Sequence, residues 1–332
     1  MGARAPRPRV GFLGVGWIGR HRMEAILATG AVEVAGIADA SAEMAAAAAT
    51  LAPGARLAST LDELLDLGLD AVVIATPSAL HAAQSIRALE CGAAVFCQKP
   101  LGRTAAEARA VVDAARAADR LLCVDLSYRF TEGMRRIREI VRAGGLGRVY
   151  AVDLVFHNAY GPDKHWFYDP ALAGGGCVMD LGVHLVDLAL WTLDWPEVAG
   201  VSARLLAGGE PLGRRVDAVE DYGLATLELA TGTVVQLACS WRLQAGRDAI
   251  ISAAFYGTEG GARLANVAGS FYDFKAERYR GTARETLSGP PDAWGGRAAA
   301  DFATRLAAGE RFDAAAEQLV AVARVLDRIY GR

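Results

Sequence analysis

The segment Gly174–Asp187 holds residue types that could carry out acid–base chemistry. Three consecutive glycines are followed by Asp180 and His184. Residues four apart on a helix share one face, and an imidazole is the side chain that titrates nearest neutral pH. His184 is therefore a candidate general acid or base. Asp180 would either orient the His184 imidazole or hold a substrate hydroxyl. The alternative is a carboxylate–imidazole pair that only supports an interface between domains.

Lys99 is a second candidate for proton transfer. It stands in Gln98-Lys99-Pro100, directly after the apolar segment Ala94–Cys97, and lysine is seldom buried without a partner. If that segment is a parallel strand, Gln98 and Lys99 lie at its carboxyl end, where open sheets bind ligands. A partly desolvated lysine can exchange a proton or hold a hydroxyl. The alternative is an exposed lysine in a loop.

A glycine motif near the N-terminus predicts a dinucleotide site. Gly14, Gly16 and Gly19, with Trp17 and Ile18 between the last two, lie between an apolar strand and a helical segment. In this arrangement the first glycine allows a tight turn, the second lets a pyrophosphate approach the backbone, and the third lets the helix pack on the strand. The N–H groups at the start of the helix then face the phosphates.

Asp39 ends the second apolar strand, where a carboxylate would accept hydrogen bonds from the adenosine ribose. The next residues, Ala40-Ser41-Ala42, supply no cation for a 2′-phosphate. The sequence therefore predicts NAD rather than NADP as the cofactor, although Asp39 could instead be only a helix cap. Thr76 and Pro77 end another strand at the same edge and are expected to border the cofactor. His81, in the following helix, lies beside the cofactor or is a surface or capping residue.

Short apolar segments alternate with helical ones in the first part of the chain, which predicts an α/β fold with a doubly wound parallel sheet. After about Ser127 the pattern changes to an α+β domain with a large, mostly antiparallel open sheet, including a hairpin around Thr231-Gly232. We therefore expect a nucleotide-binding domain over residues 1–127 and a substrate and oligomerisation domain over residues 128–332, whose last helices could pack near the first. The strands of the first domain are predicted at Val10–Leu13, Val32–Ala38, Ala71–Thr76, Ala94–Cys97 and Leu121–Leu126.

The segment from His157 to Tyr168 is rich in aromatic residues that can hydrogen-bond. Such a loop suits a polyhydroxylated ligand, and it could equally be a packed surface loop. Arg129, at the expected domain junction, could also contact a substrate, or it could cap carbonyl groups. The candidate substrate residues of the loop are Asn158, Tyr160, His165 and Trp166.

Composition excludes several classes of partner. The 332 residues carry a formal net charge of -3, which argues against nucleic acid or an anionic membrane surface. No run of about 18 consecutive apolar residues predicts a membrane span, and the basic, proline-containing start of the chain does not resemble a signal peptide. The five cysteines form no Cys-x-x-Cys pair, which favours reduced thiols and the cytoplasm. No metal site is expected, because no third ligand accompanies Asp180 and His184.

With these motifs in order along nearly the whole chain, the sequence resembles the Gfo/Idh/MocA oxidoreductases, named after glucose–fructose oxidoreductase and inositol dehydrogenase. The resemblance implies a Rossmann domain followed by an open mixed or antiparallel sheet. It implies a catalytic set of Lys99, Asp180 and His184, and assembly as a homodimer or homotetramer through the sheet face. The matching motifs also include Ala75-Thr76-Pro77 and Arg129-Phe130. One departure is Gln98, where the family most often has Glu; the amide keeps hydrogen bonding but loses the charge.

The combined prediction is an NAD(H)-dependent enzyme that transfers hydride between nicotinamide and a secondary alcohol or ketone of a sugar, cyclitol or related polyol. Two alternatives share the fold: a glycosidase that uses bound NAD transiently, and a non-catalytic NAD-binding regulator. A regulator would be expected to lose Lys99 or His184, and both are present. Net NADH formation with a free polyol separates the first class from the other two.

Overall fold

The computed structural model describes residues 6–213 and 217–332. The first residues of the basic N-terminal stretch therefore lie outside the described part of the chain. The described residues form two compact units. The first contains the chain up to Gly102, with Ala106–Asp125 and Gly296–Val320; the second contains Arg103–Ala105, Leu126–Gly295 and Ala321–Arg332.

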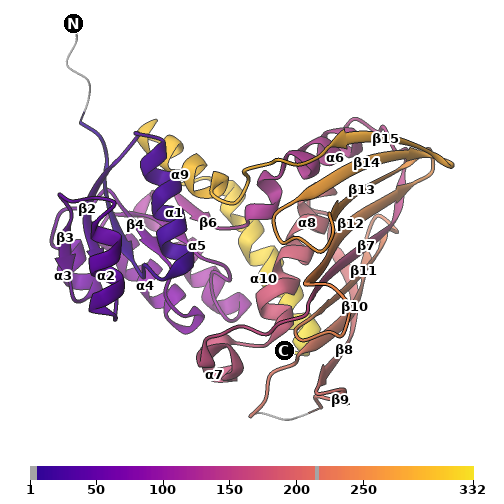
Figure 1. The fold of residues 1–332 in the computed structure, drawn as a ribbon, viewed down its shortest axis with the longest axis horizontal. Coiled ribbons are helices and arrows are strands. Elements are labelled where there is room, and N and C mark those ends of the chain that lie inside the picture. The colour runs from indigo at the N-terminus through magenta and orange to yellow at the C-terminus, as the bar shows by residue number, and fades with distance from the viewer. Residues whose placement is uncertain (1–5, 214–216) are drawn as a thin grey trace, which may run out of the picture. The chain divides into compact units, whose positions relative to one another are not determined.

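The first unit is built on a six-stranded parallel sheet in the order β3-β2-β1-β4-β5-β6, which confirms the predicted doubly wound sheet (Figure 1). Apart from the exposed first residues Arg9 and Glu33, its four inner strands are apolar and buried, as parallel strands covered on both faces require. The strands are β1 (Arg9–Leu13), β2 (Glu33–Ala38), β3 (Arg56–Ala58), β4 (Ala71–Ile74), β5 (Ala94–Cys97) and β6 (Leu122–Val124).

The crossover helices of this unit begin at the carboxyl ends of the strands. A helix from late in the chain, α9, also packs on this sheet: Phe302 on α9 contacts Phe96 on β5 with ring centroids 5.5 Å apart. Both rings are fully buried. The helices are α1 (Trp17–Ala28), α2 (Ala42–Ala49), α3 (Leu61–Leu65), α4 (Ser78–Glu90), α5 (Ala105–Ala118) and α9 (Arg297–Ala307).

The second unit contains a nine-stranded sheet in the order β15-β14-β13-β12-β7-β11-β10-β8-β9. β7 and β11 run parallel, and every other neighbouring pair among its described strands is antiparallel. This confirms the mostly antiparallel sheet and the β10–β11 hairpin. The strands are β7 (Val149–Asn158), β8 (Val198–Ala207), β9 (Glu210–Pro211), β10 (Tyr222–Leu229), β11 (Val234–Ser240), β12 (Ala249–Gly257), β13 (Gly261–Asn266), β14 (Phe274–Arg280) and β15 (Ala283–Ser288).

β14 and β15 were not expected from the sequence. β14 carries charged residues at alternate or adjacent positions, and β15 is largely exposed. These strands lie at one edge of the sheet, where only part of one face is covered, so the apolar alternation that marks a strand is weak.

Helices cover one face of the large sheet. Figure 1 shows α6 (Glu132–Arg142), α8 (Val183–Thr192) and α10 (Glu317–Tyr330) on that face, and their apolar side chains share a core with alternate residues of the strands. The remaining described helical elements are a short helix, α7 (Pro170–Ala173), a π-helical turn at Val178–Gly182, and 3-10 turns at Ser127–Phe130, His165–Tyr168 and Ala314–Ala316. The opposite face of the sheet carries no described helix of this unit.

The stretch Pro170–Thr192 is the one described helical stretch that is long and apolar enough, by length and composition, to cross a membrane. Its most apolar window has a mean hydropathy of 1.3, and 83% of that window is buried inside the protein. Packing in the core of the second unit accounts for this composition. The helix is central to the site, because it carries Asp180 and His184.

Candidate active site

The glycine loop of the first unit has the geometry of a phosphate-binding turn. Gly14 has a φ of +83°, and a Cβ there would lie 2.6 Å from the Ala75 oxygen. A Cβ on Gly19 would overlap the Gly14 oxygen, whereas the space around a Cβ on Gly16 is open. Gly16 caps α1, and no side chain caps that helix start. The first N–H groups of α1, including those of Trp17 and Ile18, therefore offer a site for phosphate.

Asp39 holds this loop in place. Its Oδ2 accepts a hydrogen bond from Val15 N at 2.6 Å, and its Oδ1 accepts one from Ser41 N at 2.8 Å. The cap of α2 is Ser41 rather than Asp39, since the Ser41 hydroxyl accepts from Met44 N. A carboxylate can accept about four hydrogen bonds, so Asp39 can hold the loop and still accept from a ribose.

His81 connects two turns at the carboxyl edge of the sheet. It is 1% exposed, so it is not a surface residue. Its Nδ1 lies 2.7 Å from the Pro100 oxygen, and its Nε2 lies 2.7 Å from the Thr76 oxygen. Burial lowers the pKa of His81, against the two carbonyl contacts that raise it. His81 therefore fixes the turn after β4, which contains Pro77, relative to the turn after β5, which contains Lys99.

Buried hydrogen bonds among Gln98, Asp125 and Arg22 also hold the turn that carries Lys99. The Gln98 amide donates to Asp125 Oδ2 at 2.7 Å, and Arg22 Nε donates to the same oxygen at 2.5 Å. Gln98, Asp125 and Arg22 are 7%, 1% and 5% exposed. The acidic side chain beside this turn is thus that of Asp125, which follows β6, and not a side chain at position 98.

Asp125 and Arg22 were missed from the sequence. The predicted strand Leu121–Leu126 placed Asp125 inside a strand, whereas β6 ends at Val124. Asp125 is therefore the first residue after a buried parallel strand, the position that Gln98 holds after β5. A carboxylate directly after an apolar run was the signal that could have found it.

In the second unit, Asp180 lies in a π-helical turn, Val178–Gly182, that precedes α8. The sequence predicted a regular helix, and single π turns are frequent at functional sites. Trp241 Nε1 donates to Asp180 Oδ2 at 3.1 Å. Trp241 is 3% exposed and directly follows β11. It was missed because nothing in its local sequence connects it to Asp180.

His184 lies in the first turn of α8 and is 7% exposed. Its ring meets the Tyr128 ring edge to face, with centroids 4.9 Å apart, and lies 6.5 Å from the Phe156 ring. Burial raises the pKa of Tyr128 well above its ordinary value, so this phenol stays neutral. The His184 ring therefore packs against the rings of Tyr128 and Phe156, which restrict its rotation and limit access of water.

The aromatic loop packs onto the same region through Trp241. Trp166 and Phe167 stack with centroids 3.8 Å apart, and the rings of Phe167 and Tyr168 contact Trp241 edge to face. The loop, Trp241 and Asp180 thus form one connected group within the second unit.

The other candidate substrate residues differ in position. Asn158 ends β7, and its Oδ1 is buried with no hydrogen-bond partner among the described residues. Side chains two residues apart on a strand share a face, so Asn158 lies on the same face of β7 as Phe156, which contacts His184. Tyr160 is exposed and donates to Asp248 at 2.7 Å, and His165 is exposed.

Arg129 forms a two-pronged ion pair with Asp187. Its Nε donates to Asp187 Oδ2 at 2.7 Å, and its second terminal nitrogen contacts Oδ1. Asp187 is 1% exposed, and burial raises its pKa against the effect of Arg129. The guanidinium also lies 5.2 Å from the Trp195 ring. These contacts assign Arg129 a structural role, and its contact with substrate stays a prediction.

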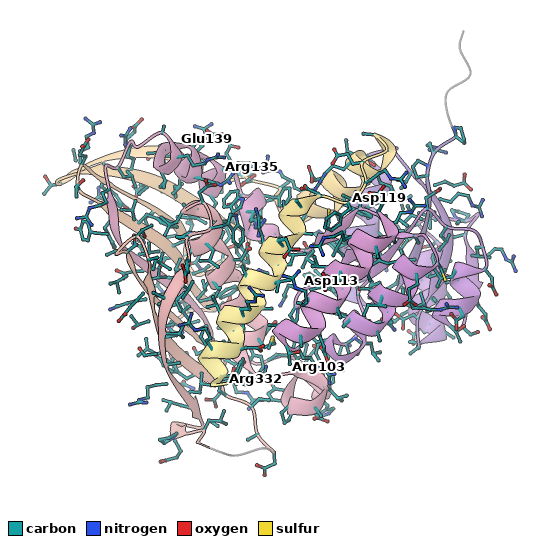
Figure 2. All side chains as sticks on the ribbon, turned by 180° about the vertical axis from the view of Figure 1, so that it is seen from behind. Arg103, Asp113, Asp119, Arg135, Glu139 and Arg332 are labelled. Carbon is teal, nitrogen blue, oxygen red and sulfur yellow. The ribbon has the colours of Figure 1, made fainter. Side chains whose placement is uncertain are left out.

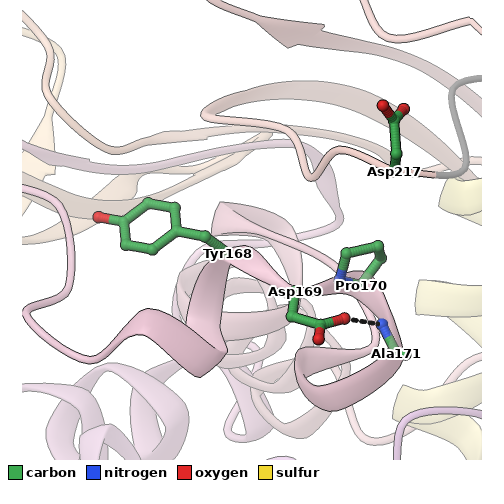
Figure 3. A pocket seen from close by; sticks show the side chains of 5 residues that line it. All are labelled: Tyr168, Asp169, Pro170, Ala171 and Asp217. Carbon is green, nitrogen blue, oxygen red and sulfur yellow. Dashed lines mark hydrogen bonds between the residues drawn. The ribbon is translucent and has the colours of Figure 1, made fainter.

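An open pocket of about 570 Å³ adjoins the end of the aromatic loop (Figure 3). Its lining is Tyr168, Asp169, Pro170, Ala171 and Asp217. The Asp169 carboxylate accepts from Ala171 N at 2.8 Å and so caps α7. Tyr168 connects this pocket to Trp241. Among residues 6–213 and 217–332, no group of three or more His, Cys, Asp or Glu side chains could hold a metal ion.

Comparison with known proteins assigns both halves of the chain. Residues 8–126 match the family model described as "Oxidoreductase family, NAD-binding Rossmann fold", and residues 134–263 match the "GFO/IDH/MocA C-terminal domain". The chain is 30% identical over 259 residues to inositol 2-dehydrogenase 3 of Saccharopolyspora erythraea, which covers 77% of this chain and 72% of that protein. It is 30% identical over 211 residues to D-glucoside 3-dehydrogenase of Escherichia coli K12, which covers 60% of each chain.

Solved structures share the whole fold. GenD2 from gentamicin A biosynthesis, in complex with NAD, superposes with a TM-score of 0.82 at 27% identity, over 100% of this chain and 95% of that chain. Levoglucosan dehydrogenase in complex with NADH and levoglucosan superposes with a TM-score of 0.83 at 24% identity, over 98% and 96%. The second likeness shows the fold alone.

Proposed function

Because the chain belongs to the Gfo/Idh/MocA family of oxidoreductases, we propose that it oxidises a secondary alcohol of a sugar, cyclitol or related polyol, or reduces the corresponding ketone. NAD supplies the hydride acceptor when it is bound. The observation that carries the proposal is the glycine loop: Gly16 has open space around it, and the start of α1 lacks a side-chain cap. Gly14, Asp39 and Thr76 lie along the same carboxyl edge, which fits a dinucleotide.

The proton is the part of the reaction that this chain's own side chains must handle. Oxidation of an alcohol releases one proton with the hydride, and we assign its removal to His184, with Lys99 holding or sharing it. The hydrogen bond from Trp241 fixes one Asp180 oxygen, so the carboxylate keeps a defined orientation just before α8, which carries His184. NAD itself accepts or donates the hydride, whereas the protein orients the reactants and transfers the proton.

The substrate class is supported by the second unit. Asn158 Oδ1 is a buried acceptor that a substrate hydroxyl would satisfy. The partly exposed rings of Trp166 and Phe167 offer apolar surface of the kind on which the C–H face of a sugar ring packs. The relatives named above are dehydrogenases of inositol and of glucosides.

The test is a panel of free polyols, cyclitols, sugars and glycosides, each incubated with the purified chain and NAD or NADP while NADH or NADPH formation and glycoside cleavage are followed. We expect NADH formation with at least one cyclic polyol. Glycoside cleavage without net NADH would support the glycosidase alternative. NAD binding without turnover of any of these compounds would support the non-catalytic regulator.

We also propose that the protein is a cytoplasmic homo-oligomer that buries the uncovered face of the nine-stranded sheet against a second copy. On that face Leu224, Val234 and Tyr256 are 43%, 39% and 37% exposed. They alternate with core residues of the same strands. Light scattering after size exclusion tests this, and a monomer at micromolar concentration would contradict it. The cysteines are free thiols, which suits a reducing compartment.

A further inference from the structure

The free backbone N–H groups at the start of the helix that carries Asp180 and His184 donate hydrogen bonds to acceptors outside the helix. The first intrahelical hydrogen bond runs from Asp180 N to the Gly176 oxygen at 3.0 Å. The four preceding N–H groups, of residues 176 to 179, have no partner within the helix. Two residues distant in sequence, Glu220 and Tyr330, accept all four.

Glu220 accepts three of these hydrogen bonds. Its Oε1 accepts from Gly176 N at 3.0 Å and from Val178 N at 2.9 Å, and its backbone oxygen accepts from Cys177 N at 3.0 Å. Glu220 is fully buried. A carboxylate at a helix N-terminus is favoured by the helix dipole, and removing a cap of this kind costs helix stability.

Tyr330 supplies the fourth acceptor and anchors the carboxylate. Its hydroxyl accepts from Met179 N at 3.0 Å and donates to Glu220 Oε1 at 2.7 Å. Burial raises the pKa of Tyr330 well above its ordinary value, with the Glu220 charge adding to the effect. The phenol therefore remains a donor across the physiological range.

The end of α10 also holds the glycine turn before the helix. Arg332 donates to the Gly174 and Arg103 oxygens, each at 2.9 Å. Figure 2 labels Arg332 and Arg103 at this end of the helix. A Cβ on Gly175 would overlap the Tyr330 hydroxyl, and one on Gly176 would overlap the Glu220 backbone. Close approach of Tyr330 and Glu220 therefore explains Gly175 and Gly176, whereas Gly174 has a positive φ and lies against Arg103.

We propose that Glu220 and Tyr330 are positioning residues that set the register of the π turn, and so the placement of Asp180 and His184. Neither residue touches the reacting atoms in this proposal; both act through the helix start. Asp180 lies one residue after Met179, whose N–H contacts Tyr330, so a shift at this contact is transmitted to the carboxylate. The catalytic consequence rests on the proposed dehydrogenase function.

The experiment compares Tyr330→Phe with Tyr279→Phe as a matched control. The Tyr279 hydroxyl also donates to a carboxylate, Glu277 Oε2, at 3.2 Å, but it lies on β14. We expect Tyr330→Phe to lower kcat by about 10- to 100-fold, since a misplacement of about 1 Å costs about 100-fold. The Kd for NADH should be unchanged, and Tyr279→Phe should keep the wild-type kcat.

A second readout does not depend on turnover. The His184 imidazole resonance, assigned among the five histidines by its loss in His184→Asn, should move in Tyr330→Phe and stay in place in Tyr279→Phe. Glu220→Gln keeps one oxygen acceptor and should retain more activity than Glu220→Ala. An unchanged kcat together with an unmoved His184 resonance in Tyr330→Phe would overturn the proposal. A wild-type protein that oxidises no polyol would refute the proposed function alone, and the resonance would still decide the positioning role.

Discussion

Replacing Gln98 by Glu tests the buried network beneath Lys99. The Gln98 amide nitrogen lies 2.7 Å from Asp125 Oδ2, so Gln98→Glu places a carboxyl oxygen opposite a buried carboxylate. The Arg22 guanidinium, 2.5 Å from the same oxygen, can balance only one of the two charges. Two like charges about 4 Å apart at a protein site repel by about 4 kcal/mol, which is equivalent to about three pH units of titration.

The introduced carboxyl group should avoid this repulsion by taking up a proton. Its folded-state pKa should therefore rise from about 4.3 into the neutral range. Because the folded pKa lies above the unfolded one, stability is fully present below about pH 4 and is lost as the pH rises through the folded pKa. Melting temperatures of the variant and the wild type should then differ little at pH 5 and by about 8 °C or more at pH 9.

The matched controls separate the network from a general effect of the charge. Gln244→Glu alters an exposed glutamine and should show no pH-dependent loss. Adding Asp125→Asn to Gln98→Glu restores a single carboxylate and a single amide, so most of the stability at pH 9 should return, as a coupled pair requires. An equal loss of melting temperature at pH 5 and pH 9, or no recovery in the double variant, would refute the like-charge explanation.

Other expectations concern the cofactor, the proton and pH. Asp39→Ser with Ala40→Arg should shift kcat/KM from NAD towards NADP, because it removes a repelling carboxylate and adds a phosphate partner; a wild-type preference for NADP would contradict the assignment. His184→Ala and Lys99→Met should each lower kcat by about 10²–10⁴-fold with NADH affinity retained, and near-normal turnover in either would remove that residue from proton transfer. Since burial lowers the pKa of His81, its contribution to stability is present above about pH 6.5 and lost on acidification. His81→Gln should flatten the fall in melting temperature between pH 7 and pH 5, and an unchanged slope would count against this role.

The sequence alone identified those parts of the site in which a local pattern carries the chemistry. Gly14, Gly16 and Gly19 are set by backbone requirements within one turn, so their spacing was enough to predict the loop. The apolar strands of the first sheet were equally visible, because strands buried on both faces are continuous apolar runs. The hairpin of β10 and β11 was found for a similar reason, since its turn and alternation are local.

Tertiary structure decided the partners of those residues. Asp125 contacts Gln98 and Arg22, and Trp241 contacts Asp180, each across 27 residues or more of chain. No local pattern records a contact between such distant segments. The edge strands β14 and β15 were missed because partial exposure weakens their alternation.

The helix that carries Asp180 and His184 shows most clearly which features follow from local sequence and which follow from tertiary contacts. The glycines, the acid and the histidine were apparent in one short segment, whereas the π turn was not. Its start depends on Glu220 and Tyr330, which lie 44 and 151 residues away from their partners Gly176 and Met179. Backbone N–H groups at a helix start must find acceptors, but only folding determines which residues of the chain supply them.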